Sequence, residues 1–154
     1  MNIWTKEIEI NAPINHVWKY FDGTLEDMQK IMPQVDKNEP VNVTENKVGS
    51  VFRQAYREGK RVQEYDVETL EYENTPDLKK LKIGFTLARM FEITAYYELK
   101  KVNETTTTLL YTATNRPLRF FSKMMLLFGN DHVVIEFVER VKRVAEEELA
   151  VREV

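Results

Sequence analysis

The side chains that usually perform nucleophilic or metal chemistry are scarce in this sequence. The chain has 154 residues with no Cys and two His, and serine occurs only at Ser50 and Ser122. A disulfide framework, a thiolate nucleophile and a Cys-bound metal are therefore excluded. His16 and His132 stand apart from any Asp/Glu-x-x-His pattern, and a zinc site needs several ligands that converge on one point at about 2 Å. We predict no metal and no cofactor.

Both histidines have a plain structural interpretation. His16 precedes the apolar pair Val17-Trp18 and is expected on the water-facing side of a first short helix. His132 falls in the first turn of the terminal helix, where the helix dipole disfavours a cation. We therefore predict a solvated His16 and an exposed or structural His132, with neither of them catalytic.

Acid, base or polarising groups could still come from the predicted strands. Five side chains would qualify if they pointed into a cavity: Arg53, Arg57, Glu64, Asp66 and Tyr111. Side chains alternate between the two faces of a strand, so Glu64 and Asp66 face solvent if Tyr65 and Val67 face inward. The alternation disfavours a catalytic carboxylate, and we assign no catalytic residue.

The two arginines pose a question of register. Arg53 and Arg57 lie on one face of their strand, and Phe52 and Tyr56 lie on the other. Burial of an unpaired guanidinium group is costly, which favours the register with the two aromatic residues inside. The opposite register, with the arginines inside, remains an alternative.

Hydrophobic patterning predicts a strand at residues 2–10, two short helices, six further strands and a long C-terminal helix. Pro13 suits the start of the first helix, and Thr24 with Asp27 three residues later forms an approximate capping box for the second. Period-two patterning with hairpin-length links then predicts strands at residues 39–45, 49–58, 60–71, 79–89, 91–102 and 105–115. Short links join antiparallel neighbours, so these strands should form one curved antiparallel sheet.

Apolar residues at spacings of three and four predict an amphipathic helix from about residue 131 to Arg152. Its apolar stripe consists of Val134, Phe137, Val138, Val141, Ala145 and Leu149. A helix of this length spans roughly 33 Å, enough to cross a whole sheet. A single curved sheet must bury such a stripe against its concave face. The predicted architecture is an α+β fold in which a curved seven-stranded antiparallel sheet wraps around the long C-terminal helix, in one domain over residues 1–154.

The space between sheet and helix is the candidate binding site. A twisted sheet diverges from a straight helix toward its edges, so inward side chains either close the gap or leave a chamber. Many inward candidates are aromatic, which suits an apolar pocket with a few hydroxyl groups, although aromatic residues at strand spacing are also usual in a filled core. The candidate ligand-binding residues are Phe52, Tyr56, Tyr65, Phe85, Tyr97, Tyr111, Phe121, Met125, Phe137 and Val141.

Residues 117–128 carry more apolar side chains than one helical face can hide. They could pack beneath the strand ends as a lid on the core, or line a cavity mouth and move to admit a ligand, since Met adapts to variable shapes. A third interpretation is peripheral membrane contact, with Arg116, Arg119 and Lys123 near lipid headgroups. The uncharged apolar run at residues 124–128 is far shorter than the roughly 20 residues of a membrane-spanning helix.

Several strings in the chain are similar to a known superfamily. They are Glu7-Ile8-Glu9-Ile10-Asn11-Ala12-Pro13, then Val17-Trp18 with Phe21, then Val48-Gly49-Ser50 at a strand start, and Val144-Ala145-Glu146 in the terminal helix. Over essentially its full length the sequence resembles the START / SRPBCC superfamily, which includes polyketide cyclases, plant pathogenesis-related (Bet v-like) allergens and lipid-transfer domains. The resemblance implies a helix-grip fold with a deep hydrophobic cavity for lipids, polyketides, hormones or other apolar molecules. The superfamily also has a subset of members similar to a chaperone-activating domain.

Charge and the first residues indicate where such a protein would work. The formal net charge is −3 and the isoelectric point is near 5.6, so no basic field favours nucleic acid. Residues 1–10 alternate apolar and charged side chains and lack the basic and apolar regions of a signal peptide. We expect a cytoplasmic monomer or homodimer without a nucleic-acid partner.

The hypothesis that the sequence favours is binding of a small hydrophobic or amphipathic ligand, of lipid-, polyketide- or aromatic-like character, between the sheet and the C-terminal helix. Two alternatives remain open. One is a polyketide cyclase or dehydratase that acts through a Tyr, Arg and carboxylate set; the other is a protein-interaction module of the chaperone-activator kind. The scarcity of nucleophiles favours binding over catalysis.

Overall fold

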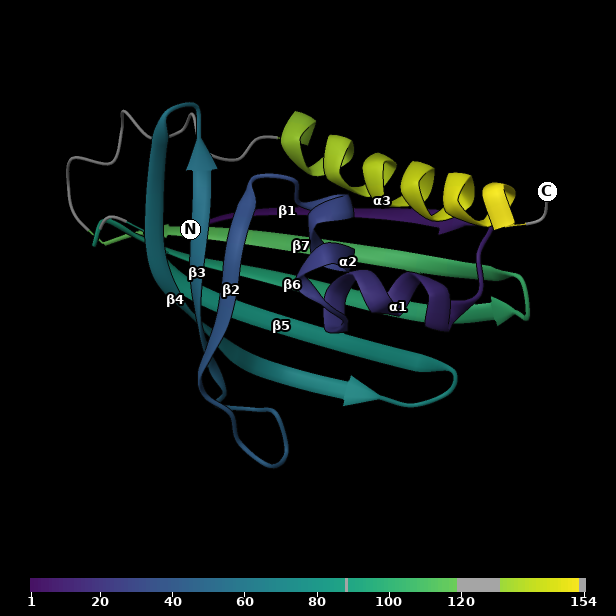
Figure 1. Cartoon of the computed structure of the whole chain (residues 1–154), viewed down its shortest axis with the longest axis horizontal. Helices are drawn as coiled ribbons and strands as arrows, with labels where there is room; N and C mark the ends of the chain where they lie inside the picture. Colours follow the sequence, from purple (N-terminus) through teal and green to yellow (C-terminus); the bar gives the residue numbers. More distant parts are fainter. Residues whose placement is uncertain (88, 119–130, 153–154) are drawn as a thin grey trace.

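The described part of the chain forms one curved seven-stranded antiparallel sheet with three helices on its concave side (Figure 1). This computed structural model describes residues 1–87, 89–118 and 131–152. The elements, in chain order, are β1 (Asn2–Ile10), α1 (Ile14–Asp22), α2 (Leu25–Ile31), β2 (Val35–Asn42), β3 (Val51–Glu58), β4 (Arg61–Asn74), β5 (Leu78–Leu87), β6 (Phe91–Asn103), β7 (Thr106–Pro117) and α3 (Asp131–Arg152). The predicted helix-grip fold is confirmed.

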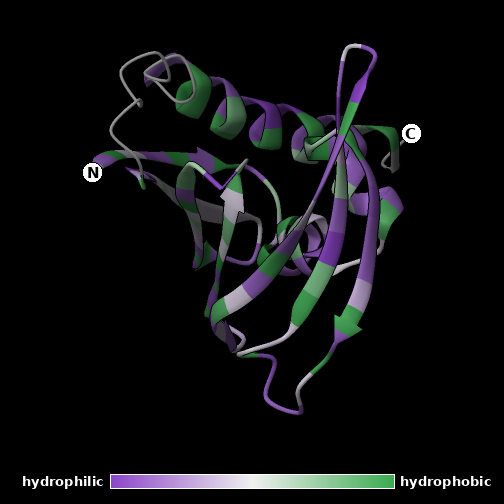
Figure 2. Ribbon diagram, turned by 90° about the vertical axis from the view of Figure 1, so that its left-hand side faces the viewer, coloured by the Kyte–Doolittle hydropathy of each residue, from purple (hydrophilic) through white to green (hydrophobic). Residues whose placement is uncertain are grey.

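The sheet has the strand order β1-β7-β6-β5-β4-β3-β2 and is bent strongly along β4. In Figure 1, β2 and β3 stand at a steep angle to β1, β5, β6 and β7. Apolar and polar residues alternate along the strands, and Figure 2 shows this as alternating hydrophobic and hydrophilic segments. The concave face therefore meets the helices, and the opposite face meets water.

One strand begins earlier than predicted. The strand expected at 39–45 is β2, which starts at Val35, directly after α2. Val35 is buried, and its amide donates to the Met32 carbonyl oxygen at 3.1 Å while its Cα pairs with Tyr56. Burial of one apolar side chain thus brings the chain into the sheet before the alternating pattern becomes visible. Pro40 is tolerated because β2 is an edge strand.

The corner between α1 and α2 depends on two local features. The Thr24 hydroxyl oxygen accepts a hydrogen bond from the Asp27 amide at 3.1 Å, which confirms the predicted cap of α2. Gly23 lies so close to the Lys19 carbonyl oxygen that a Cβ atom there would overlap it. The two short helices can therefore turn sharply and cover one end of the concave face.

Helix α3 packs along β1 and β7 with the predicted apolar stripe. Val134, Phe137, Val138, Val141 and Ala145 are all buried. At the polar edge of the stripe, Lys142 Nζ donates to the Glu9 carbonyl oxygen at 2.9 Å and to Glu146 Oε2 at 2.6 Å, as the i,i+4 spacing predicts. Within the described residues, no helix combines the length and apolarity needed to cross a membrane.

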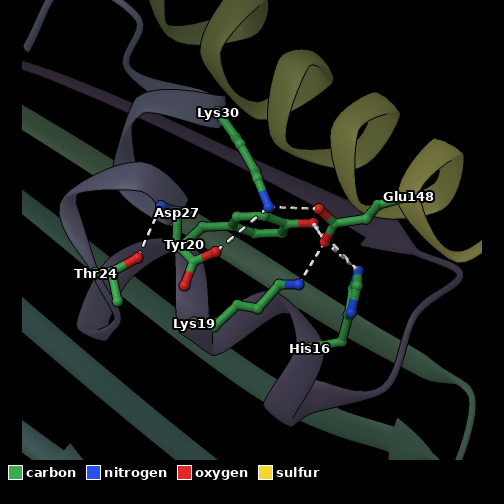
Figure 3. A network of polar contacts seen from close by, with 7 residues as sticks. All are labelled: His16, Lys19, Tyr20, Thr24, Asp27, Lys30 and Glu148. Atoms are coloured by element: carbon green, nitrogen blue, oxygen red, sulfur yellow. Dashed lines mark hydrogen bonds and ion pairs between the residues drawn. The ribbon is translucent and has the colours of Figure 1, made fainter.

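A partly buried ionic cluster fastens the C-terminal part of α3 to α1 and α2 (Figure 3). Glu148 Oε1 accepts a hydrogen bond from the Tyr20 hydroxyl at 2.8 Å and also contacts Lys19, while Oε2 accepts from Lys30 Nζ at 2.7 Å. His16 Nε2 lies 3.4 Å from Glu148 Oε1 and 3.1 Å from the Tyr20 hydroxyl. One carboxylate thereby holds three helices together.

The prediction of a solvated His16 is wrong. Only 7% of its side chain is exposed, because Glu148 of α3 covers it. The two residues are 132 positions apart, so the periodicity of α1 alone does not reveal the contact. His132, by contrast, is exposed and lies 2.9 Å from Glu136.

The cluster makes folding sensitive to acid. Burial raises the pKa of the Glu148 carboxyl group, but hydrogen bonds from Lys19, Lys30 and Tyr20 outweigh that effect and lower it to about 2. An unfolded chain releases the same proton near the ordinary value of 4.5. The stabilisation is therefore fully present above that value and is lost as the pH falls toward 2.

Substitution Glu148→Gln should lower the free energy of unfolding at pH 7 by about 1–3 kcal/mol, since it removes a charged hydrogen-bond acceptor. The deficit should shrink as the pH falls from 4.5 toward 2, where the wild-type carboxylate also becomes neutral. Urea titrations across this range measure both effects. The matched control is Glu147→Gln at an exposed position of the same helix. An equal loss in both variants, or a loss independent of pH, would contradict the assignment.

Candidate ligand-binding site

Two hollows on the concave face are lined by the described residues. The larger, which we call the α3 chamber, has a volume of about 360 Å³ and lies between the sheet and the first turn of α3. Its lining includes Tyr56, Tyr65, Phe85, Tyr111, Asn115 and Val134. The other, which we call the α2 chamber, has a volume of about 230 Å³, and its lining includes Phe21, Met28, Met32, Phe52, Gln54 and Tyr97.

A polar bridge lies between the two chambers. The Tyr65 hydroxyl, from the α3 chamber, donates to Gln54 Oε1 at 3.0 Å. Gln54, from the α2 chamber, is only 8% exposed, and its Nε2 lies 3.4 Å from Asn38 Oδ1. These contacts satisfy a buried amide and separate the two hollows.

An aromatic cluster continues this division. The Tyr97 and Tyr111 rings stack with centroids 5.2 Å apart, and Phe137 of α3 lies 4.7 Å from the Tyr111 centroid and 5.8 Å from that of Tyr97. Phe137 and the fully buried Val141 belong to the packed core and line neither chamber. Part of the grip is therefore filled, and part of it is hollow.

The structure resolves the register of β3 in favour of inward aromatic residues. Phe52 lines the α2 chamber and Tyr56 lines the α3 chamber. Arg53 turns outward and its Nη1 lies 3.2 Å from Asp66 Oδ1, while Arg57 pairs with Asp36 at 2.7 Å. The alternative register with buried arginines is wrong.

The two strand carboxylates also lie where alternation places them. The side chains of Glu64 and Asp66 are 45% and 59% exposed, whereas Tyr65 and Val67 turn toward the interior. Neither carboxylate lines a chamber on the concave face.

The other candidate residues divide between these places. Tyr56, Tyr65, Phe85 and Tyr111 come together in the α3 chamber, and Phe52 and Tyr97 in the α2 chamber. Phe121 and Met125 lie outside the described residues. Two buried polar residues, Gln54 and Asn115, are absent from the candidates that the sequence suggested. Both occupy inward positions of their strands, so alternation applied to polar as well as aromatic side chains would have found them.

Titratable groups inside the chambers are phenols that stay neutral. Burial raises the pKa of Tyr111 to about 12 and that of Tyr97 well above its ordinary value of 10. Burial, followed by the proximity of Tyr56, also raises the pKa of Tyr65. These hydroxyl groups are therefore neutral hydrogen-bonding groups at pH 7, and they are very weak acids.

Charged side chains occur at the rims. Asp22 and Lys47 border the α2 chamber, Glu58 borders the α3 chamber, and all three are exposed. Asp22 Oδ2 accepts a hydrogen bond from the Tyr72 hydroxyl at 2.6 Å. Among the described residues, no group of three or more His, Asp or Glu side chains could hold a metal ion. The interior offers shape, stacking and neutral hydrogen bonds.

Residues 1–146 match the family described as polyketide cyclase / dehydrase and lipid transport. The chain belongs to this family. Membership is consistent with the resemblance of the sequence to the SRPBCC superfamily and supports a ligand-binding or cyclase-type function. Among curated protein sequences there is no significant match to this family member.

Solved structures show the same fold at low sequence identity. The Zhui aromatase/cyclase from Streptomyces sp. R1128 is 14% identical with a TM-score of 0.70, over 96% of this chain and 95% of that one. Norcoclaurine synthase from Thalictrum flavum is 14% identical with a TM-score of 0.65, over 96% and 95%. The protein TTHA0849 from Thermus thermophilus is 14% identical with a TM-score of 0.66, over 99% and 100%. This family member thus has the helix-grip (Bet v 1-like) fold.

Truncation of the aromatic cluster should reveal which part of the grip is filled. Phe137→Ala should cost about 3–5 kcal/mol in the free energy of unfolding, because Phe137 packs on two rings in the core. Phe52→Ala, the matched control, should cost clearly less, because Phe52 borders the α2 chamber. Urea titration measures both. Equal losses would contradict the division into core and chamber.

The raised pKa values predict instability in alkali. An unfolded chain releases phenol protons near pH 10, whereas folded Tyr111 retains its proton up to about 12. The folded state then binds more protons, so the free energy of unfolding should fall as the pH rises above 10. Denaturant titrations combined with phenolate absorbance test this. If all seven tyrosines ionised near pH 10 in the intact fold, the argument would fail.

Proposed function

We propose that this protein binds a small, uncharged or weakly amphipathic molecule with at least one aromatic ring in the α3 chamber. The observation that carries the proposal is a hollow of about 360 Å³ with aromatic walls and neutral polar groups. Small-molecule sites commonly have volumes of roughly 300–1,000 Å³ and apolar linings with a few placed polar groups.

The walls of the α3 chamber suit a planar ligand. Tyr65 and Phe85 are stacked, with centroids 4.7 Å apart and an angle of 17° between their planes. Tyr111 supplies a second ring face, and Ile93 and Val134 supply aliphatic surface. Ring faces and methyl groups favour offset stacking with an aromatic guest.

Polar groups in the same chamber would orient the guest. Three tyrosines and one asparagine line it: Tyr56, Tyr65, Tyr111 and Asn115. Because burial keeps the phenols of Tyr56 and Tyr111 protonated, they can donate to a carbonyl, ether or hydroxyl oxygen of the ligand. The Tyr65 hydroxyl already donates to Gln54, so it can only accept a hydrogen bond from the ligand. The Tyr65–Gln54 bridge closes the chamber toward the α2 side, which favours a compact guest over an extended acyl chain.

A cyclase-type reaction is the second candidate. Its support is the family and the likeness to an aromatase/cyclase and to norcoclaurine synthase. In this chain such a reaction would depend on folding a flexible substrate against the chamber walls, with phenol hydroxyls polarising a carbonyl group. A cytoplasmic location and a monomeric or homodimeric state remain predictions from the sequence.

Filling the chamber tests the proposal. Ala113 lines it from β7, and Ala113→Phe should occupy the ligand's volume. The probe is the neutral dye N-phenyl-1-naphthylamine, whose fluorescence rises in an apolar site. The dissociation constant should increase at least about tenfold, equivalent to about 1.4 kcal/mol. The matched control, Ala150→Phe, lies at an exposed position of α3 and should bind like wild type.

Thermal unfolding of each variant shows whether the fold is retained. If wild type did not bind the dye, the proposed function would be wrong for guests of this size. If folded Ala113→Phe bound it as tightly as wild type, the site would not be the α3 chamber.

A further inference from the structure

The sheet is split between β4 and β5. Their pairing runs from Asn74 and Lys79 to Glu68 and Gly84 and ends there. Beyond that point β4 continues beside β3 as far as Arg61, and β5 continues beside β6 as far as Leu87. Figure 1 shows β4 turning away from β5 over this stretch.

Local sequence explains why the strands part. The pairing of β4 with β5 shifts register between Thr69 and Glu71, so Leu70 forms a bulge. A bulge bends its strand and increases its twist. Gly84 of β5 lies opposite Leu70 of β4, and a Cβ atom at Gly84 would lie only 2.9 Å from Leu70 Cδ1. Glycine thus lets the bulged strand cross closely before it turns away.

Two aromatic side chains close the split. Tyr65 of β4 and Phe85 of β5 are the stacked pair of the α3 chamber. The same two residues also line a groove of about 700 Å³ on the convex face, which we call the outer groove. Its other walls include Arg53, Glu68, Leu70, Thr86, Arg89 and Glu92. One layer of stacked side chains therefore separates the outer groove from the α3 chamber.

Such a partition differs from the rest of the sheet. Elsewhere a paired backbone ladder lies between the two faces, and a molecule could pass only by breaking it. At the split a molecule needs only rotation of Tyr65 and Phe85 about their side-chain bonds, together with loss of the Tyr65–Gln54 hydrogen bond. Rotamer changes of this kind are fast compared with the opening of backbone structure.

We propose that the split between β4 and β5 is a side portal through which ligand reaches the α3 chamber from the convex face, with Tyr65 and Phe85 as its gate. The proposal rests on the proposed binding function and adds the route of access. The α3 chamber also borders Trp4, Val133 and Val134 beside the first turn of α3, and a mouth at that place is the competing route.

Charges around the outer groove bear on the guest that would pass. The rim carries the carboxylates of Glu64, Asp66, Glu68 and Glu92 together with the guanidinium groups of Arg53 and Arg89. Arg53 is already paired with Glu64 and Asp66. Lys37 also pairs with Glu64, and Arg116 pairs with Glu92. The rim therefore carries little net charge, and a neutral guest meets no electrostatic barrier there.

Association kinetics test the portal. Stopped-flow fluorescence with N-phenyl-1-naphthylamine gives the association and dissociation rate constants separately from the dissociation constant. Thr86 is exposed and lines the outer groove on the convex face, outside the α3 chamber. Thr86→Trp should therefore slow association and dissociation by a similar factor of about five or more, with little change in the dissociation constant. The matched control is Thr5→Trp, at an exposed position of β1.

A second pair of variants opens the gate. Phe85→Ala should speed association, because it removes half of the stacked pair. Tyr96→Ala, which shortens a half-buried aromatic side chain of β6 that lines neither chamber nor the outer groove, should leave the association rate unchanged. Melting temperatures show that each variant is folded.

The outcomes separate the two proposals. If wild type binds the dye and Ala113→Phe does not, yet Thr86→Trp and Phe85→Ala both leave the association rate within about twofold of wild type, the portal is wrong and the mouth beside α3 is the route. An equal slowing by Thr5→Trp would also overturn the portal. If wild type does not bind the dye at all, the proposed function fails, and the portal fails with it.

Discussion

The bend in β4 is the constraint on which the rest of this structure depends. One continuous strand of 14 residues pairs with β3 along its first half and with β5 along its second half. The two halves of the sheet therefore face α3 at different angles. Side chains from both halves cannot all meet over a straight helix, and space remains on the concave face. The chambers are a geometric result of the bend, and the aromatic residues reduce and shape them.

Stability and binding are placed at opposite ends of α3. Its C-terminal half is held by Glu148 to α1 and α2, and by Lys142 and Glu146 to the end of β1. Its first turn borders the larger hollow with Val133 and Val134. A cavity always forfeits packing contacts, so a fold with a hollow must be secured elsewhere. The ionic cluster around Glu148 meets this need because partial burial strengthens its hydrogen bonds.

Sequence patterning predicted most of the fold and the facing of the strand residues at the site, but it did not predict contacts between distant elements. A strand with one solvent-exposed face has alternating apolar and polar residues in its sequence. This alternation correctly predicted that Phe52 and Tyr56 face inward. It also predicted that Glu64 and Asp66 face outward. No periodic pattern in the sequence indicates the contact of His16 with Glu148. It joins residues on two helices whose relative position depends on the bend of the sheet, and local periodicity carries no information about that bend.

The same limit applies to the interior of the grip. The sequence identified Phe85, Tyr111 and Phe137 as inward residues alike, but it could not tell which of them would pack and which would border a hollow. That difference depends on a bulge at Leu70 and on the end of the β4–β5 pairing at Gly84. Both features can be recognised only once the pairing of the two strands is known. Single irregularities in a ladder thus decide where a regular pattern leaves space.

The chemistry of the interior depends on which side chains can line the chambers that the bend creates. Around the chambers, charged groups lie at the rims or in ion pairs, since an unpaired charge inside the grip would be costly. The ammonium group of the buried Lys79 lies apart from both chambers, where it contacts Asn74 and the Trp18 ring. Phenols can enter because they remain neutral, and burial raises their pKa values further from physiological pH. Proton transfer by these groups becomes harder as their burial increases, whereas hydrogen bonding becomes stronger. The grip therefore favours recognition by shape and neutral hydrogen bonds, and any reaction within it would have to draw its rate from the way the substrate is held.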